Sequence, residues 1–164
     1  MVVDLGSDLR PEDFLYSGIK IDAQLSTDLL INLFATDTPL HDGAILVKGN
    51  KIISAGVILP LSRQGISRYG TRHLAALGIT ERFDRCICIV VSEETGTLSL
   101  ANQGKLERPI TSSRLQELLN DFIGGLSNQT ILKSSTNRNV SMPKKETIDI
   151  ISSVGVDKSV KNSD

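Results

Sequence analysis

Three short polar clusters interrupt an otherwise apolar sequence, and their side chains are of the kinds that bind metal ions and phosphates. They are Leu-His-Asp-Gly-Ala at 40–44, Gly-Thr-Arg-His at 70–73 and Val-Ser-Glu-Glu-Thr-Gly at 91–96. Each cluster is expected at the end of a strand or the start of a helix, where mixed sheets present side chains and backbone N–H groups to a ligand. The clusters therefore predict a binding site for a charged ligand.

The first cluster places a histidine directly before an aspartate. His41 and Asp42 can bind a divalent ion together, or the Asp42 carboxylate can accept a proton from a hydroxyl nucleophile. The alternative is structural, because Asp-Gly is a common turn: His41 would then hydrogen-bond to a neighbouring carbonyl while Asp42 caps the turn. The residues alone leave both interpretations open.

The second cluster has the composition of a polyphosphate site. Thr71, Arg72 and His73 stand at the expected start of a helix, where free N–H groups and the positive end of the helix dipole favour an anion. Arginine also matches phosphate oxygens two at a time. The alternative is that Thr71 caps the helix and Arg72 is solvated.

The third cluster carries the acidic pair Glu93-Glu94 directly after the most apolar run of the chain, Cys86–Val91. That placement indicates a second metal-binding or phosphate-positioning site. The alternative is a solvent-facing loop, which is what such an acidic pair most often forms. The sequence holds no P-loop, no Cys-x-x-Cys pair and no nucleophilic Ser-His arrangement that would compete with this interpretation.

The elements that must position these clusters follow from hydrophobic periodicity and turn residues. Helical spacing predicts helices over 26–36, 71–79 and from 111 to the Gly124-Gly125 pair, which is expected to stop the last one. Apolar, β-rich runs predict strands at 44–47, 51–59, 86–91, 97–100 and 105–109, the first two joined by a Gly49-Asn50 turn. This order predicts an α/β fold with a mixed sheet flanked by helices.

Composition predicts one globular domain over residues 8–126, followed by a polar, disordered tail over 127–164. With 40% hydrophobic and 23% charged residues and a net charge of -1, the chain resembles an ordinary soluble protein and not a nucleic-acid binder. It has no apolar run long enough to span a membrane. Cys86 and Cys88 alternate with isoleucine, so they are expected to be reduced core thiols of a cytoplasmic protein.

Taken together, the three clusters resemble the diadenylate cyclase domain family over residues 12–125. The run 39–44 is similar to the family's Asp-Gly-Ala motif, 70–73 with 75–78 to its Arg-His-Arg motif, and 92–96 to its Ser-Glu-Glu loop. The flanking segments 18–23 and 59–62 agree as well. Similarity is greatest to the branch of the family that carries a membrane anchor, which would place the domain at the cytoplasmic face of a membrane.

The resemblance implies that two ATP molecules are condensed into cyclic di-AMP, with release of two pyrophosphates, where two copies of the chain face one another. It implies that Asp42 is catalytic and that a divalent ion, Mn²⁺, Mg²⁺ or Co²⁺, is bound by His41, Asp42 and Glu94. The implied ATP-binding residues are Gly43, Ala44, Ile58, Leu59, Thr71, Arg72, His73, Ser92 and Glu93. Gly43 and Ala44 would let the backbone approach the sugar, and adenine would lie against Ile58-Leu59.

One position departs from the family motif, which usually ends in a second arginine where this chain has Leu74. If that arginine holds phosphate, ATP binding is weaker here; if it is a surface or interface residue, leucine is tolerated. The departure motivates one alternative function, an ATP-binding or cyclic di-AMP-binding module with weak or no catalysis. A structural interaction domain, whose clusters are only turns and caps, is the other.

Overall fold

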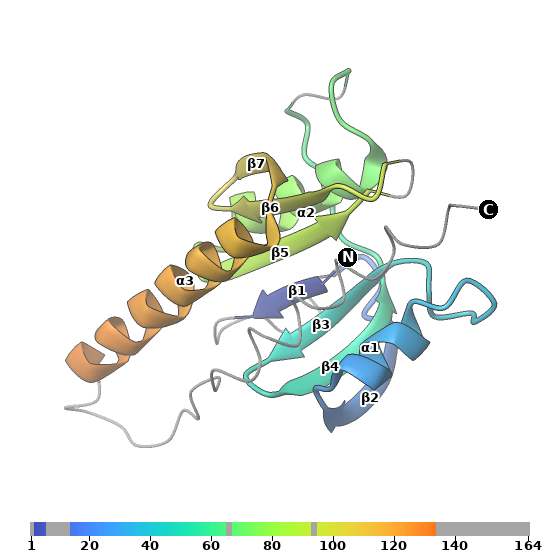
Figure 1. Ribbon diagram of the computed structural model, residues 1–164, viewed down its shortest axis with the longest axis horizontal. Helices are drawn as coiled ribbons and strands as arrows, with labels where there is room; N and C mark the ends of the chain where they lie inside the picture. Colours follow the sequence, from blue (N-terminus) through green and yellow to red (C-terminus); the bar gives the residue numbers. More distant parts are fainter. Residues whose placement is uncertain (1, 6–13, 65–66, 93–94, 134–164) are drawn as a thin grey trace.

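The computed structural model describes residues 2–5, 14–64, 67–92 and 95–133. In chain order the described elements are β1 (Val2–Leu5), β2 (Ile19–Gln24), α1 (Thr27–Leu33), β3 (Ala44–Lys48), β4 (Lys51–Val57), α2 (Thr71–Arg82), β5 (Cys86–Val91), β6 (Leu98–Asn102), β7 (Lys105–Ile110) and α3 (Ser112–Lys133). The strands form one sheet in the order β2-β4-β3-β1-β5-β6-β7 (Figure 1). Because β1 runs parallel to β3 and antiparallel to β5, the sheet is mixed, and the predicted α/β class is confirmed.

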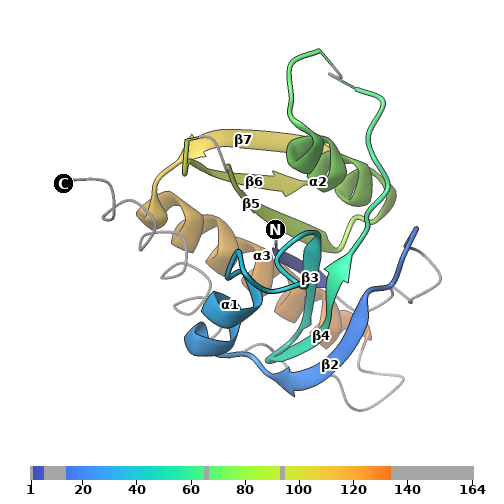
Figure 2. The same cartoon turned by 90° about the vertical axis from the view of Figure 1, so that its right-hand side faces the viewer.

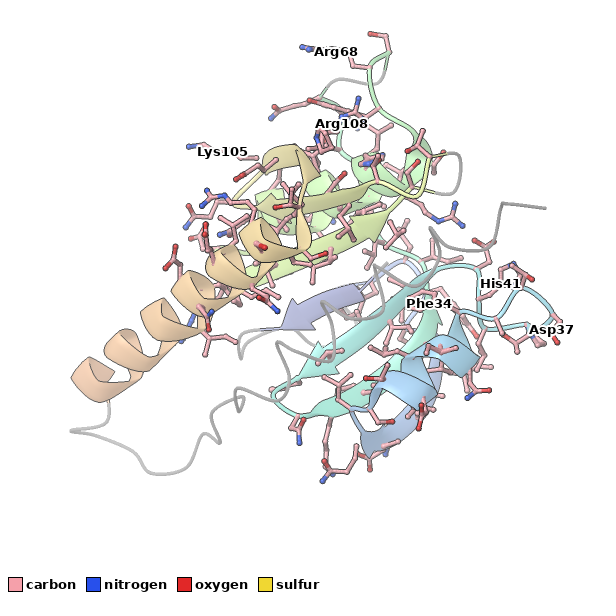
Figure 3. The ribbon with its side chains drawn as sticks, in the orientation of Figure 1. Phe34, Asp37, His41, Arg68, Lys105 and Arg108 are labelled. Atoms are coloured by element: carbon pink, nitrogen blue, oxygen red, sulfur yellow. The ribbon has the colours of Figure 1, made fainter. Side chains whose placement is uncertain are left out.

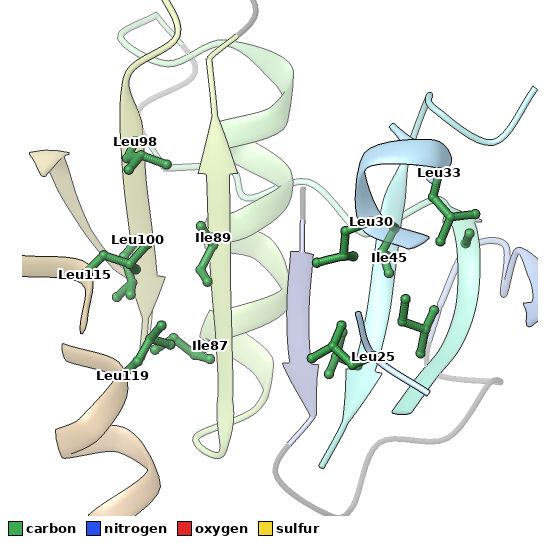
Figure 4. Packing of buried hydrophobic residues seen from close by; sticks show 13 residues of the cluster. Leu25, Leu30, Leu33, Ile45, Ile87, Ile89, Leu98, Leu100, Leu115 and Leu119 are labelled. Carbon is green, nitrogen blue, oxygen red and sulfur yellow. The ribbon is translucent and has the colours of Figure 1, made fainter. Parts of the chain in front are cut away.

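The helices cover both faces of the sheet. Figure 2 shows α2 on the opposite side from α1 and α3. Side chains of β5 alternate between the two resulting cores. Ile87 and Ile89 pack with leucines of α1 and α3 (Figure 4), whereas Cys88 and Val90 belong to the core on the side of α2, with its alanines. A strand buried on both faces needs a continuous apolar run, which explains why 86–91 lacks polar alternation.

The two cysteines belong to the α2 side of the core. Cys86 and Cys88 are both buried and are not joined in a disulfide, as their spacing along one strand predicted. Burial raises the pKa of the Cys88 thiol to about 12, so this thiol stays protonated at neutral pH.

The predicted β3–β4 hairpin is confirmed, with Lys48 paired to Lys51 across the Gly49-Asn50 turn. The first helix is shorter than predicted: α1 ends at Leu33 and not at residue 36. Its start agrees with the sequence, because the Ser26 side chain accepts a hydrogen bond from the Leu29 N–H at 3.2 Å.

The prediction that Gly124-Gly125 stops the last helix is wrong, because α3 continues to Lys133. A glycine inside a helix costs only about 1 kcal/mol relative to alanine, and Leu115 and Leu119 already fix the preceding turns in the core. Residues 127–133 are therefore helical and not part of a disordered tail. Residues 134–164, which include the rest of the predicted tail, lie outside the described part of the chain.

Two strands were absent from the sequence prediction. β1 lies at the centre of the sheet although it precedes residue 8, where the domain was expected to begin. β2 forms one edge and pairs with β4 around an irregularity between Lys20 and Ala23. Among the described helices, none is both long and apolar enough to cross a membrane.

Candidate functional site

The predicted clusters meet at one end of the sheet. β3 begins at Ala44 opposite the last residue of β4, Val57, and β6 begins at Leu98 opposite the last residue of β5, Val91. The first cluster precedes β3, and the third follows β5. Helix α2, which starts with the second cluster, packs against β5 and β6.

An ion pair joins the first cluster to the second. A guanidinium nitrogen of Arg72, Nη2, lies 3.6 Å from Oδ1 of Asp42. The Asp42 side chain is 83% exposed and that of Arg72 30% exposed, so the pair is open to solvent and contributes little to stability. It places a guanidinium group beside a carboxylate that remains accessible, so the arginine is not the merely solvated residue of the alternative interpretation.

His41 is oriented by its own loop. Its Nδ1 lies 2.6 Å from the Thr38 carbonyl oxygen, and because a carbonyl only accepts, Nδ1 carries the proton. This is the bond expected from the structural interpretation, yet it also leaves Nε2 as the ring nitrogen that could bind a ligand. A backbone carbonyl on the other ring nitrogen is the usual orienting contact of a metal-binding histidine.

Gly43 is required by packing. Its φ is 110°, and a Cβ added there would stand 2.8 Å from the carbonyl carbon of Gly56. The glycine therefore lets the segment before β3 approach β4, which differs from the expected reason, a close approach of the sugar. The neighbouring Ala44 has its side chain fully buried in the core on the α2 side.

The start of α2 is open to an anion. Gly70 is the N-cap, and within the described residues no side chain caps the helix, so the alternative role of Thr71 as a cap is wrong. The first turn contains no acidic residue. Thr71 is exposed and Arg72 half-buried beside the uncapped turn, an arrangement that favours phosphate.

His73 and Leu74 point into the protein. His73 was expected among the ATP-binding residues, but its side chain is 7% exposed and its Nε2 lies 3.2 Å from Oγ of the buried Ser99 on β6. Burial, and after it the positive charge of Arg108, lowers the pKa of His73. Leu74 is also 7% exposed, so this chain uses the position of the missing arginine for packing.

The expected adenine platform is partly exposed. Ile58 is 55% exposed and pairs with the exposed Tyr16, whereas Leu59 is buried. The Ile58 N–H donates to the Tyr16 carbonyl at 3.0 Å. The Ile58 N–H is therefore already bonded and does not donate to a base.

The third cluster closes the turn from β5 to β6. The Ser92 N–H donates to the Thr97 carbonyl at 3.0 Å, and the Gly96 N–H donates to the Ser92 carbonyl at 2.9 Å. Glu93 and Glu94 lie outside the described residues. The Ser92 N–H and carbonyl are thus both bonded within the turn, and among the described residues the Ser92 hydroxyl accepts a 3.4 Å contact from the Thr95 N–H.

A complete metal site is not found in the part of the chain that the structure describes, where no three His, Cys, Asp or Glu side chains converge. Two of the three expected ligands, His41 and Asp42, are described and are adjacent in the chain. An imidazole nitrogen and a carboxylate oxygen are donors that Mn²⁺, Mg²⁺ or Co²⁺ accepts, so these residues fit the expected ion.

Sequence analysis missed Tyr69, Ser99 and Arg108, which surround the start of α2. The Arg108 guanidinium carbon lies 5.1 Å from the centre of the Tyr69 ring, and that ring is tilted against the His73 ring with centroids 6.5 Å apart. The only local signal was an aromatic residue directly before Gly70. The contact between Arg108 and Tyr69 depends on β7, the strand that carries Arg108, being paired with β6 in the sheet.

Fold and site together define an α/β domain with a candidate phosphate-binding helix start beside a carboxylate. The chain matches the DAC family model, described as DisA bacterial checkpoint controller nucleotide-binding, over residues 1–106. It therefore belongs to that family, and the resemblance seen in the three clusters is confirmed.

Curated relatives agree with the family. A diadenylate cyclase of Listeria monocytogenes serotype 1/2a (strain 10403S) is 46% identical over 120 residues, which are 72% of this chain and 44% of the relative. The cyclic di-AMP synthase CdaA of Bacillus subtilis (strain 168) is 47% identical over 109 residues, 65% of this chain and 40% of that protein. The chain thus spans less than half the length of these relatives.

Solved structures show the same fold. DacA from Staphylococcus aureus, crystallised as a double mutant, is 40% identical, has a TM-score of 0.67, and is matched over 74% of this chain and 81% of its own. A hypothetical membrane spanning protein from Bacillus cereus is 42% identical with a TM-score of 0.59, over 64% of this chain and 52% of its own.

Proposed function

We propose that this domain is the catalytic part of a diadenylate cyclase, which condenses two ATP molecules into cyclic di-AMP and releases two pyrophosphates. The observation that carries the proposal is the 3.6 Å ion pair between Arg72 and Asp42, because it joins a phosphate-binding group to an accessible carboxylate. The names of the relatives, diadenylate cyclase and cyclic di-AMP synthase, support the same reaction.

The chemistry needs a base and a phosphate cradle. Each new 3′,5′-phosphodiester forms when the ribose 3′-oxygen of one ATP attacks the α-phosphorus of the other, while the bond from that phosphorus to pyrophosphate breaks in line. Asp42 accepts the hydroxyl proton or holds the ion that acidifies the hydroxyl. Thr71, Arg72 and the uncapped N–H groups of α2 neutralise the phosphates, and such positioning supplies most of the acceleration in phosphoryl transfer.

The remaining ligand contacts are assigned as follows. Adenine lies on the exposed apolar surface at Ile58, next to Leu59, and the backbone of Gly43-Ala44 borders the sugar. Ser92 and Glu93 help to position the phosphates of the bound ATP. We assign His73 to holding α2 in place instead of contacting phosphate, because its ring is buried against Ser99.

A divalent ion completes the proposed site. His41 through Nε2 and Asp42 through its carboxylate would hold it, with Glu94 as the third ligand. When bound, the ion supplies positive charge that offsets the charge of the triphosphate. We propose Mn²⁺, Mg²⁺ or Co²⁺ as candidates.

Catalysis requires a second copy of the chain. The product is symmetric, with two identical bonds made by two identical attacks, so two protomers that face one another across a two-fold axis present one ATP each. We therefore propose that a single protomer binds ATP but does not cyclise it. Specific activity should rise with protein concentration in the dilute range, and a constant value down to dilutions where light scattering shows only monomer would contradict the two-copy arrangement.

The test of the proposed function is direct. The full chain is incubated with ATP and MnCl₂, and cyclic di-AMP is sought by mass spectrometry. Appearance of the cyclic product supports the proposal. Binding of ATP without product would instead favour the alternative, a nucleotide-binding module that lost catalysis with the arginine now replaced by Leu74.

The proposal includes a location in the cytoplasm or at the cytoplasmic face of a membrane, because the substrate is ATP and the buried cysteines form no disulfide. We propose no nucleic-acid partner, because the net charge of the chain is -1.

A further inference from the structure

The start of α2 is held by side chains that the proposed reaction does not use. Three elements contribute to this arrangement: the segment before α2 provides Tyr69, β6 provides Ser99, and β7 provides Arg108. Arg108 lies where β7 comes close to α2 (Figure 3). We call these three residues together with His73 the α2 anchor.

The inner contact of the α2 anchor is the pair formed by His73 and Ser99. Both side chains are buried, at 7% and 0% exposure, and the ring nitrogen and hydroxyl oxygen are 3.2 Å apart. His73 is in the first turn of α2 and follows Arg72 directly. The pair therefore ties the turn that carries Arg72 to the sheet.

The outer contact is a stack. The Arg108 guanidinium carbon lies 5.1 Å from the centre of the Tyr69 ring, within the range of a cation–π interaction. The Tyr69 ring in turn lies against the His73 ring, with 6.5 Å between centroids. The stack joins the inner pair through the His73 ring and holds Tyr69, the residue before the N-cap Gly70, where glycine by itself gives the backbone freedom.

We infer that Arg108 is a positioning residue, which by stacking on Tyr69 holds the start of α2 so that Arg72 faces Asp42. Arg108 is on the edge strand β7, and no described contact links it to Asp42, so it acts through Tyr69 and His73. The inference rests on the proposed function, because the geometry that it maintains is that of the phosphate-binding helix start. It assigns a role to a second arginine, in addition to Arg72, in a chain that has Leu74 where the family motif has its second arginine.

The test compares kinetic constants of full-length variants. Arg108→Gln and Tyr69→Leu should each raise KM for ATP about two- to fivefold, the effect of an exposed cation–π contact, with a smaller change in kcat. Arg108→Lys and Tyr69→Phe keep the cation and the ring, so they should restore KM to nearly the wild-type value. Lys105→Gln, a charge removal on the same strand, is the matched control and should leave KM unchanged.

A double-mutant cycle distinguishes positioning from general stabilisation. Because both changes break one stack, Arg108→Gln in the Tyr69→Leu background should add nothing further to KM. Three results would overturn the inference. The two substitutions could raise KM independently, so that their effects multiply in the double variant; Arg108→Gln could have the same KM as Lys105→Gln; or Arg108→Gln could lower the melting temperature and leave KM unchanged.

The same variants separate this inference from the proposed function. If the wild-type chain binds ATP but makes no cyclic di-AMP, the proposed function fails alone, and the Kd for ATP replaces KM as the readout of the anchor. If the wild-type chain binds no ATP, both fail.

Discussion

The two sides of the candidate site are fixed in different ways. On the Asp42 side the backbone is decisive: Gly43 packs against Gly56, and the Thr38 carbonyl holds His41. On the Arg72 side, side chains of the α2 anchor tie the helix start to β6 and β7. Backbone packing fixes the chain and leaves the Asp42 carboxylate 83% exposed, whereas side-chain packing leaves Arg72 only 30% exposed. The exposed Asp42 side suits proton transfer or metal binding, and the more buried Arg72 side suits phosphate binding.

The largest expected effect is on the Asp42 side. Asp42→Asn keeps the shape of the side chain but removes its charge and basicity, so cyclic di-AMP synthesis should fall about 10²- to 10⁴-fold while ATP binding remains largely intact. Product formation followed by mass spectrometry, with ATP affinity by calorimetry, checks this. Asp37→Asn, an exposed carboxylate in the same loop, is the control, and equal activities of the two variants would refute the role of Asp42.

The backbone contact itself is the next target. Gly43→Ala should lower the free energy of unfolding by about 3 kcal/mol, because the new Cβ meets the Gly56 backbone and φ is positive. Gly96→Ala is the matched control: its φ of 67° is also positive, but no atom of the described residues lies within 4 Å of the new Cβ, so about 1 kcal/mol is expected. Urea unfolding measures both, and equal losses would show that packing at Gly43 is unimportant.

On the Arg72 side, Arg72→Ala should weaken ATP binding by about 1.5–3 kcal/mol, the value of a charge-assisted hydrogen bond. Isothermal titration gives the Kd. Arg82→Ala, at the other end of the same helix, is the control and should bind ATP as the wild type does. If Arg72→Ala bound ATP as tightly as the wild type does, the start of α2 would not be the phosphate-binding site.

The smallest effect concerns pH and the α2 anchor. Burial first, and the charge of Arg108 second, lower the pKa of His73 below 6.5, so the unfolded chain binds this proton at a higher pH than the folded chain does. The free energy of unfolding should therefore fall as pH decreases from about 6.5 toward the folded-state pKa, by less than about 1.4 kcal/mol per pH unit, and be constant above.

Denaturation midpoints between pH 5 and 8 measure this dependence. Arg108→Gln should have a shallower slope below pH 6.5, because the variant lacks one of the two causes of the shift. A slope that is identical in the variant would exclude the charge of Arg108 as a contributor.

Much of the fold was predictable because local chemistry determined it. The Gly49-Asn50 turn and the two-sided burial of 86–91 left clear patterns in the sequence. β2 left a weaker sequence pattern, because it is an edge strand whose pairing with β4 shifts in register between Lys20 and Ala23, where Asp22 adopts a φ of 49°. The four-residue β1 becomes a strand through its two neighbours, β3 and β5.

The candidate site was predictable in its residues but not in its construction. Asp42 and Arg72 stood out by type and position, yet their contact spans thirty residues of sequence and depends on where α2 packs. The burial of His73 depends on Ser99, which is 26 residues away on another strand. The Tyr69–Arg108 stack likewise joins segments that no local pattern connects.

A crystal structure of the full chain with 3′-deoxy-ATP and Mn²⁺ tests the central claim most directly, because that nucleotide binds without the attacking hydroxyl. The account predicts phosphates at the start of α2, and a ribose C3′ that leaves room for an oxygen about 3 Å from the Asp42 carboxylate. An Asp42 side chain far from every ribose, in any pairing of the copies, would contradict it.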